Sequence, residues 1–285
     1  MVYKDTVQEQ FAVDKAWEQL SQRLDNEGLL PKTGVDKTLR NRHSAYRKLY
    51  IAATLAACLF LGWYFMHNTY NSDIIMRITY NEVPATTLVT VLEDGSVAYL
   101  SEQTSLKYPE HFAGDKREVF LHGEAFFEIK KQSDRPFFID TELAGIEITG
   151  TSFKIKSDTN GSFLLSVREG EVRVHRKKPN QTLSVKAGET LLFDTEQLQL
   201  IKHETGFNEY FKRILFKDER LANIVTVINL HSDSIQLKVA PDLEHRITFT
   251  YLEHSDIAEI AEAICLALNL QHTRQGNIVY ISKQQ

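Results

Sequence analysis

The sequence predicts a mixed fold: a short N-terminal helix, one transmembrane helix, an all-β domain of sandwich, roll or solenoid type, and a small α+β domain. Three observations predict it. An uncharged run fills residues 49–66, about ten short strands follow with no credible helix between about 83 and 200, and two strand–helix–strand units come last. The expected parts are residues 1–48, 49–66, 74–200 and 208–285.

Residues 49–66 read LYIAATLAACLFLGWYFM and contain no charged side chain. At about 1.5 Å per residue, a helix of this length comes close to the ~30 Å hydrocarbon core of a bilayer. A buried helix of a soluble core is the alternative, but such helices usually carry a polar stripe. Tyr50, Trp63 and Tyr64 lie near the ends of the run, where aromatic rings favour the headgroup layer. The run therefore predicts a single transmembrane helix.

The charges on either side of this run indicate its orientation. The 12 residues before it include Lys37, Arg40, Arg42, Arg47 and Lys48, whereas residues 67–76 contain one charge, Asp73. Because basic flanks stay in the cytoplasm, residues 1–48 are expected inside the cell membrane and the residues after the helix outside it. A cleaved signal peptide is a weaker alternative, since its apolar segment would begin near the N-terminus.

The overall composition excludes several classes of protein. The 285 residues include 33 basic and 38 acidic ones, a net charge of −5, so no basic excess suggests direct binding of nucleic acid. Of the two cysteines, Cys58 lies in the expected membrane segment and Cys265 far along the part after it, so they cannot form a disulfide within one chain. Cys265 falls on the apolar side of a predicted helix and is expected in the core.

The cytoplasmic segment contains one amphipathic helix, predicted over residues 6–27. Val13, Trp17, Leu20 and Leu24 recur at spacings of four, three and four, which places them on one face. Such a short segment cannot bury this stripe by itself. Either the helix lies on the membrane surface, or it docks on a cytoplasmic partner with Trp17 as anchor. Residues 28–48 are polar and basic and form an expected tether to the bilayer.

Short runs of β-branched and aromatic residues then alternate with turn signals. Asp94-Gly95, Gly123, Gly150, Gly170 and Gly188 stand at the expected strand ends, where turns favour glycine. In the run 123–129, Phe126 and its flanking acids share one strand face, and the interpretation is either an ordinary half-buried strand or an exposed binding surface. The expected strands cover 87–91, 96–100, 118–122, 125–129, 136–141, 145–149, 152–156, 162–168, 171–176, 182–185 and 190–194.

The residues of this region that carry a family resemblance are Asp94, Gly95, Ser96, Tyr108, Pro109, Phe112, Gly123, Glu124, Ala125, Phe126, Phe127, Glu128, Pro136, Phe137, Gly150, Thr151, Phe153, Gly170, Gly188 and Glu189. In order and spacing, more than a hundred residues here resemble the FecR domain. The resemblance implies a single-pass inner-membrane regulator of an extracytoplasmic-function sigma factor, usually an anti-sigma factor, with a cytoplasmic N-terminal part and a periplasmic FecR domain. Glu93, Ser101, Lys154 and Ala187 depart from the usual pattern and are interpreted as loop or surface changes.

The last part, residues 208–285, is expected to form two strand–helix–strand units. Asp218 and Ser255 are the expected caps of two helices with apolar faces, and a hairpin around Gln275-Gly276 closes the chain. The layout resembles the domain that follows FecR domains in many relatives and the secretin/TonB short N-terminal fold. That resemblance implies contact with the signalling domain of a TonB-dependent outer-membrane transporter. The alternative is a lid that only stabilises the β domain.

The sequence carries no signature of catalysis. The ten histidines form no HxH, HExxH or Cys/His cluster, and no P-loop, GxGxxG or GxSxG is present. We therefore expect no enzyme, no metal and no cofactor. The resemblance to the FecR family implies signal relay from an outer-membrane transporter to a sigma factor, which is the first hypothesis. A membrane-anchored periplasmic scaffold that binds glycan or protein is the second hypothesis. A membrane-anchored hydrolase is the third, with Glu124 and Glu128 its only candidate acids.

Overall fold

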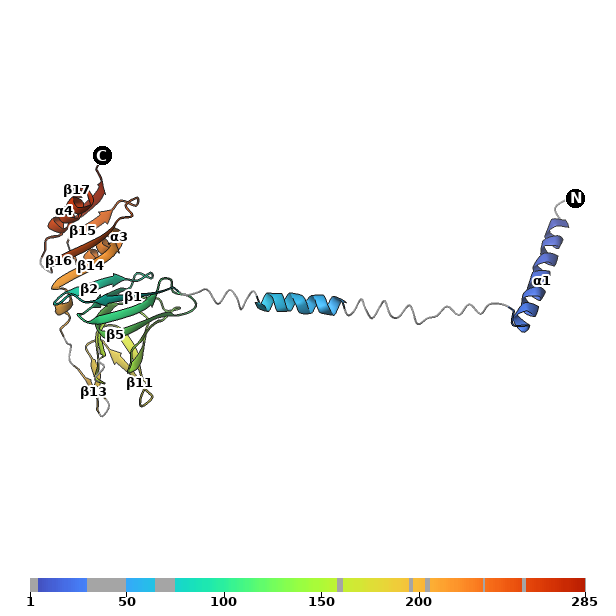
Figure 1. The fold of residues 1–285 in the computed structure, drawn as a ribbon, viewed down its shortest axis with the longest axis horizontal. Helices are drawn as coiled ribbons and strands as arrows, with labels where there is room; N and C mark the ends of the chain where they lie inside the picture. The colour runs from blue at the N-terminus through green and yellow to red at the C-terminus, as the bar shows by residue number, and fades with distance from the viewer. Residues whose placement is uncertain are drawn as a thin grey trace. The chain divides into compact units, whose positions relative to one another are not determined.

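In the computed structural model of the protein, the described residues are 5–29, 50–64, 75–157, 161–194, 197–202, 206–232, 234–252 and 255–284. The chain divides into two compact units, residues 1–72 and 73–285 (Figure 1).

The described residues of the first unit form two helices. α1 (Asp5–Asn26) agrees with the helix predicted over 6–27, and it ends where Gly28 takes a φ of +66° and Leu29 donates its backbone N–H to the Leu24 carbonyl at 3.0 Å. Residues 50–64 form the second helix, within the predicted span 49–66, of which residues 49, 65 and 66 lie outside the described ranges. Among the described residues, none of the helices combines the length and apolar character needed to cross a bilayer.

The second unit is built on a large curled sheet of 15 strands that folds into two layers, with a separate three-stranded sheet near the C-terminus (Figure 1). One layer has the order β1-β4-β5-β6-β7-β10-β11, and the other β13-β12-β9-β8-β5-β3-β2-β14-β16, so β5 belongs to both. The strands of the first part are β1 (Met76–Asn81), β2 (Thr87–Val91), β3 (Val97–Leu100), β4 (Thr104–Pro109), β5 (Arg117–Glu128), β6 (Phe137–Asp140), β7 (Ala144–Ile148), β8 (Ser152–Ser157), β9 (Phe163–Glu169), β10 (Glu171–Arg176), β11 (Gln181–Lys186), β12 (Thr190–Phe193) and β13 (Leu198–Ile201).

Most of these strands lie within two residues of their predicted positions, and no helix lies among the described residues between 83 and 200, as predicted. β1, β4 and β13 were not predicted. The predicted break at Gly123-Glu124 is wrong, since β5 runs through it as a single strand of 12 residues. The strand bends instead of ending because Gly123 has a φ of +106°, which an L side chain rarely adopts.

The bend at Gly123 is what allows β5 to serve both layers. Before it, β5 pairs with β4 and β6; after it, β5 pairs with β3 and β8. A Cβ atom at position 123 would lie 2.6 Å from Thr104 Oγ1 and 3.0 Å from Thr104 Cα, so no side chain fits there. The Thr104 hydroxyl in turn accepts a hydrogen bond from the Glu124 backbone N–H at 2.9 Å.

The first hydrophobic core fills the space between the two layers. Alternate residues of most strands point into it, as the period of two in a strand requires. From β5 these are Val119, Leu121, Ala125 and Phe127, all buried, and Phe127 stacks on Phe153 of β8 at 5.7 Å between ring centroids.

The C-terminal part adds two helices and five strands. β14 (Arg213–Arg220) extends the large sheet by pairing in parallel with β2, and β16 (Arg246–Leu252) follows β14 in the same sheet (Figure 1). The predicted strand–helix–strand order is present, with α3 (Leu221–Leu230), α4 (Ile257–Leu268), β15 (Gln236–Val239), β17 (Leu270–Gln275), β18 (Ile278–Lys283) and the 3₁₀ turn η1 (Asn208–Tyr210). The large sheet therefore includes strands from both predicted domains, 74–200 and 208–285. The boundary between these two domains stays a prediction.

The two predicted helix caps are wrong. Asp218 lies in β14 with a φ of +47°, at an irregularity in its pairing with β16, and α3 begins after Arg220 without a side-chain cap. α4 is capped by Asp256, whose carboxylate accepts the Ala258 N–H at 2.9 Å, one residue beyond the predicted Ser255. The Ser255 hydroxyl instead accepts a weak bond from the Leu252 backbone N–H at 3.3 Å.

Replacing Gly123 with alanine tests the bend in β5. We expect Gly123→Ala to lower the free energy of unfolding by about 3 kcal/mol, because both the positive φ and the contact with Thr104 become unfavourable. Gly95→Ala is the matched control: Gly95 also has a positive φ, +82°, but its Cβ would meet only Lys130 at an ordinary 3.6 Å. Thermal unfolding of the full chain in detergent, followed by circular dichroism, measures both; equal losses would contradict the steric account.

Candidate functional site

The apolar stripe predicted on the first helix lies exposed on α1. Val13, Trp17 and Leu20 are 55%, 65% and 47% exposed, and Leu24 is half-buried. All four lie within α1, at the spacings that place them on one face. The first unit therefore presents a row of large apolar side chains around an indole ring.

The second candidate surface lies on the face of the larger layer that points away from the first core. Val89, Val97, Tyr99 and Phe126 lie on this face and belong to a second hydrophobic core, shared with α3, α4 and the three-stranded sheet. Phe126 is 0% exposed. Both interpretations of this strand are therefore corrected: it is neither half-buried nor an exposed surface, because the chain's own C-terminal part covers it.

The segment around η1 supplies the side chains that cover Phe126. The ring of Phe126 lies 5.5 Å from that of Phe207 and 5.8 Å from those of Tyr210 and Phe211, and the Arg168 guanidinium lies 4.8 Å from its centroid. Such aromatic and cation–π contacts add to the gain from burial. Phe126 is thus the central contact between the motif strand and residues 207–211.

Glu124 forms an ionic contact on one side of Phe126. Its carboxylate accepts the Tyr210 hydroxyl at 2.8 Å and pairs with Lys154 at 2.9 Å. Lys154 also pairs with Glu209 at 2.6 Å, and its side chain is only 11% exposed. The interpretation of Lys154 as a surface change is therefore wrong: it lies in this contact and links β5 to η1.

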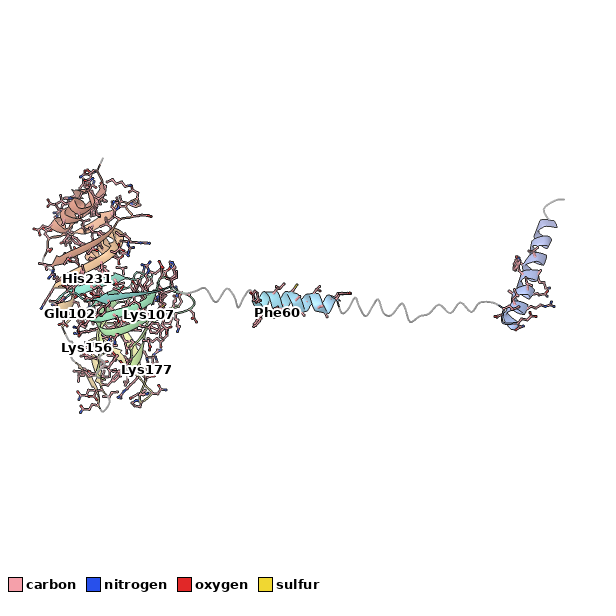
Figure 2. All side chains as sticks on the ribbon, in the orientation of Figure 1. Phe60, Glu102, Lys107, Lys156, Lys177 and His231 are labelled. Carbon is pink, nitrogen blue, oxygen red and sulfur yellow. The ribbon has the colours of Figure 1, made fainter. Side chains whose placement is uncertain are left out.

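Glu128 forms a second ionic contact on the other side. Its carboxylate accepts the Tyr99 hydroxyl and an Arg168 N–H, each at 2.8 Å, and lies 3.5 Å from His231 Nε2. The Tyr99 hydroxyl is also 2.7 Å from His231 Nε2. His231 is the residue that follows α3. Figure 2 labels His231 and also Lys156 of β8. Lys156 belongs to the first ionic contact, where it pairs with Glu124 at 3.4 Å.

The surroundings of the two acids favour their charged forms. Burial by itself raises the pKa of Glu128, but hydrogen bonding and charge from His231, the Tyr99 hydroxyl and Arg168 outweigh it and hold the pKa below its usual range. Burial also raises the pKa of Glu124. Hydrogen bonds and charge from Lys154, Tyr210 and Lys156 outweigh that effect, so the pKa of Glu124 is lowered as well. Both carboxylates are charged at neutral pH and hold the C-terminal part on the sheet.

A further group of motif residues stabilises the β2–β3 turn. Asp94 accepts bonds from the backbone N–H and the hydroxyl of Ser96 at 3.0 and 2.7 Å, and it pairs with Arg117 at 2.5 Å. The Arg117 and Asp94 side chains are 0% and 4% exposed, and Arg117 also donates to the carbonyls of Arg135 and Lys130. This buried pair ties the turn to the start of β5.

The remaining motif residues have structural positions. A Cβ at Gly150 or Gly170 would lie 2.7 or 2.5 Å from neighbouring atoms, and Gly188 has a positive φ. The Glu189 carboxylate accepts the Lys186 N–H at 2.9 Å. Phe112 packs edge-on against Phe137, and the Pro136 carbonyl accepts the Arg117 N–H. Ala125, Phe127 and Phe153 lie in the first core, Tyr108 packs against that core, Thr151 is buried, and Pro109 ends β4.

A polar groove of about 670 Å³ lies beside β1, β2 and β14. Its charges are largely paired among themselves, as in Arg77–Glu110 at 2.5 Å and Arg246–Asp218 at 3.2 Å. Within the described part of the chain, no group of three His, Cys, Asp or Glu side chains could hold a metal ion. Cys265 is a free, buried thiol in the second core, as predicted, and burial raises its pKa.

Residues 84–173 match the family model described as FecR protein. The chain therefore contains a FecR domain, which confirms the resemblance carried by the motifs. Two crystal structures described as a "putative anti-sigma factor" from Parabacteroides distasonis are similar to this chain, with TM-scores of 0.44. They are 19% and 18% identical to it and cover 73% and 74% of it and all of their own chains. No curated protein matches the sequence.

Truncating Phe126 tests the packing of the C-terminal part on the motif strand. We expect Phe126→Ala to lower the free energy of unfolding by about 3–5 kcal/mol, because it leaves a cavity among Phe207, Tyr210 and Phe211. Phe120→Ala is the control, since Phe120 lies on the same strand but is 40% exposed and should lose about 1 kcal/mol. Chemical denaturation of the full chain in detergent measures both, and similar losses would argue against the central role of Phe126.

The lowered pKa values of Glu124 and Glu128 predict a dependence of stability on pH. A carboxyl with a depressed folded-state pKa stabilises the fold above its unfolded pKa of about 4.3 and loses that contribution as the pH falls through its folded pKa. We therefore expect the midpoint temperature of thermal unfolding to decrease as the pH is lowered from about 5 to about 3. Glu128→Gln should lower the midpoint at pH 7 and flatten this decline; an unchanged pH profile would show that Glu128 is not one of the groups responsible.

Proposed function

We propose that this protein is a single-pass inner-membrane anti-sigma factor. Its periplasmic part senses the state of a TonB-dependent outer-membrane transporter, and its cytoplasmic helix binds and releases an extracytoplasmic-function sigma factor. The exposed apolar stripe of α1 is the observation that carries the proposal, because it lies on the same chain as a FecR domain.

The stripe of α1 has the properties of a helix that binds in a groove. Partners of such helices receive apolar side chains at positions i, i+3, i+4 and i+7, and Trp17, Leu20 and Leu24 follow this spacing. A tryptophan at the centre of the row fits the role of anchor, because large aromatic side chains contribute much of the energy of such interfaces. Membrane-surface binding by the same stripe remains the alternative role.

The uncharged run 49–66 supports the membrane anchor. Every side chain of residues 50–64 is exposed, and most are large and apolar, which is unfavourable in water and suits a lipid environment. The basic residues before the run and their scarcity after it support a cytoplasmic N-terminus. This orientation puts α1 and the FecR domain on opposite sides of the inner membrane.

The second unit supports the periplasmic half of the proposal. Its C-terminal part is packed on the motif strand through Phe126, Glu124 and Glu128, so a partner that binds the C-terminal part can act on the FecR domain through these contacts. The likeness of residues 208–285 to the secretin/TonB short N-terminal fold makes the signalling domain of a transporter the proposed partner. Proteolysis of the anchored chain is the proposed means of releasing the cytoplasmic piece.

The main alternative is a membrane-anchored scaffold that binds glycan or another envelope protein. In that case residues 1–48 serve only as an anchor. The two functions differ in one property, since only the relay requires α1 to contact a cytoplasmic protein.

Substituting Trp17 tests the docking face directly. We expect Trp17→Ala to weaken binding of the sigma factor by roughly 30-fold, the loss typical of an interface anchor, without changing membrane insertion. The measurement is co-purification of the sigma factor with the tagged full chain from membranes, with insertion checked by extraction at alkaline pH.

Gln22→Ala is the matched control, because Gln22 is exposed on the opposite side of α1 and its loss removes no apolar contact. Equal recovery of the sigma factor with wild type, Trp17→Ala and Gln22→Ala would show that the docking face is assigned wrongly. A version lacking residues 1–27 that still binds a transporter or glycan, while no form of the chain binds a sigma factor, would favour the scaffold.

A further inference from the structure

β16 forms the end of the larger layer in the second unit. Among the described strands it pairs only with β14, so the backbone N–H and C=O groups of its other edge have no strand partner (Figure 1). Residues 247–252 read ITFTYL, without a charge, a proline or a glycine. An edge strand of this composition is a template for pairing with another strand.

The other edges of the C-terminal part are protected in ways that β16 is not. β17, an edge of the three-stranded sheet, carries Arg274, and β15, its other edge, carries Lys238. A charge in an edge strand discourages the approach of a second strand. β16 has only Arg246, at its first residue, and Leu252 at its last is 56% exposed.

We propose that β16 is a self-association edge, which pairs in antiparallel register with β16 of a second copy about a two-fold axis at Phe249. This register places Phe249 opposite its counterpart, Ile247 opposite Tyr251 and Thr248 opposite Thr250. Aromatic and β-branched pairs on one face, and threonine pairs on the other, are among the favourable cross-strand combinations. The sequence around Phe249 is thus complementary to itself.

The packing of β16 within one copy supports the same arrangement. Ile247, Phe249 and Tyr251 face the second core, and the ring of Tyr251 stacks on those of Phe216 and Phe249 at 6.2 and 6.3 Å. A second copy continues this row of rings across the axis. Because residues 247–252 are uncharged, two copies meet there without electrostatic repulsion.

The contact is small, since one strand from each copy buries less than the roughly 1,200 Å² of a standard stable interface. We therefore expect a dimer that forms and dissociates with concentration. The inference does not depend on the sigma-factor role of α1, and each can fail without the other.

Two variants that differ in one residue test the pairing and its register. Thr248 and Thr250 are both exposed, so substitutions there leave the cores intact. In Thr248→Lys/Thr250→Lys, lysines face each other twice across the axis, and we expect the dissociation constant of the dimer to rise about tenfold or more. In Thr248→Lys/Thr250→Glu, each lysine faces a glutamate, and we expect a dissociation constant close to that of the wild type.

The measurement is sedimentation equilibrium of the full chain in detergent over a range of concentrations, with circular dichroism to confirm folding. Both variants lose the bond from the Asp218 N–H to the Thr248 hydroxyl, so this loss cancels in the comparison. A wild-type protein that stays monomeric at all concentrations would overturn the proposal, and β16 would then be an edge available only to a strand of another protein. A dimer that the double-lysine variant leaves unchanged, or that both variants abolish, would overturn the proposed register of β16.

Discussion

The second unit depends on one strand that changes direction without ending. β5 must pair with β4 and β6 in one layer and with β3 and β8 in the other, and the bend at Gly123 is what permits it. The close approach of Thr104 makes the bend a steric requirement as well as a conformational one. The buried Asp94–Arg117 pair holds the start of the same strand in place.

The bend also creates a layer that is buried on both faces. Beyond Gly123, Ala125 and Phe127 point into the first core, whereas Phe126 points into the second. Glu124 and Glu128 share the face of Phe126 and must therefore be compensated where they are partly buried, since an uncompensated charge there would be costly. Tyr210 with Lys154, and Tyr99 with Arg168 and His231, provide that compensation. The interface thus combines charge pairing with the packing of aromatic rings around Phe126.

Much of this architecture follows from local sequence signals, because alternation and turn glycines act over a few residues. They placed β2, β10 and α1 almost to the residue. The parallel pairing of β2 with β14 joins residues more than a hundred positions apart, and no local pattern specifies it. For the same reason the predicted environment of Phe126 is wrong. The local alternation indicates a half-buried strand, but Phe207 and Tyr210, which are distant in sequence, cover Phe126 in the fold. One signal was available, since Lys154 departs from the family pattern at a position that faces Glu124.

The junction of β2 and β14 has a consequence for how such proteins evolve. If residues after 206 were removed, β2 would become an unpaired edge strand. The sheet face that carries Tyr99 and Phe126 would then be exposed to solvent. The FecR segment and the C-terminal segment are therefore unsuited to free recombination as interchangeable modules. Consider a chimera that takes its FecR segment from one relative and its C-terminal segment from another. It would fold well only if the C-terminal segment supplied suitable partners for Glu124, Phe126 and Glu128. The two segments are expected to be inherited as a pair.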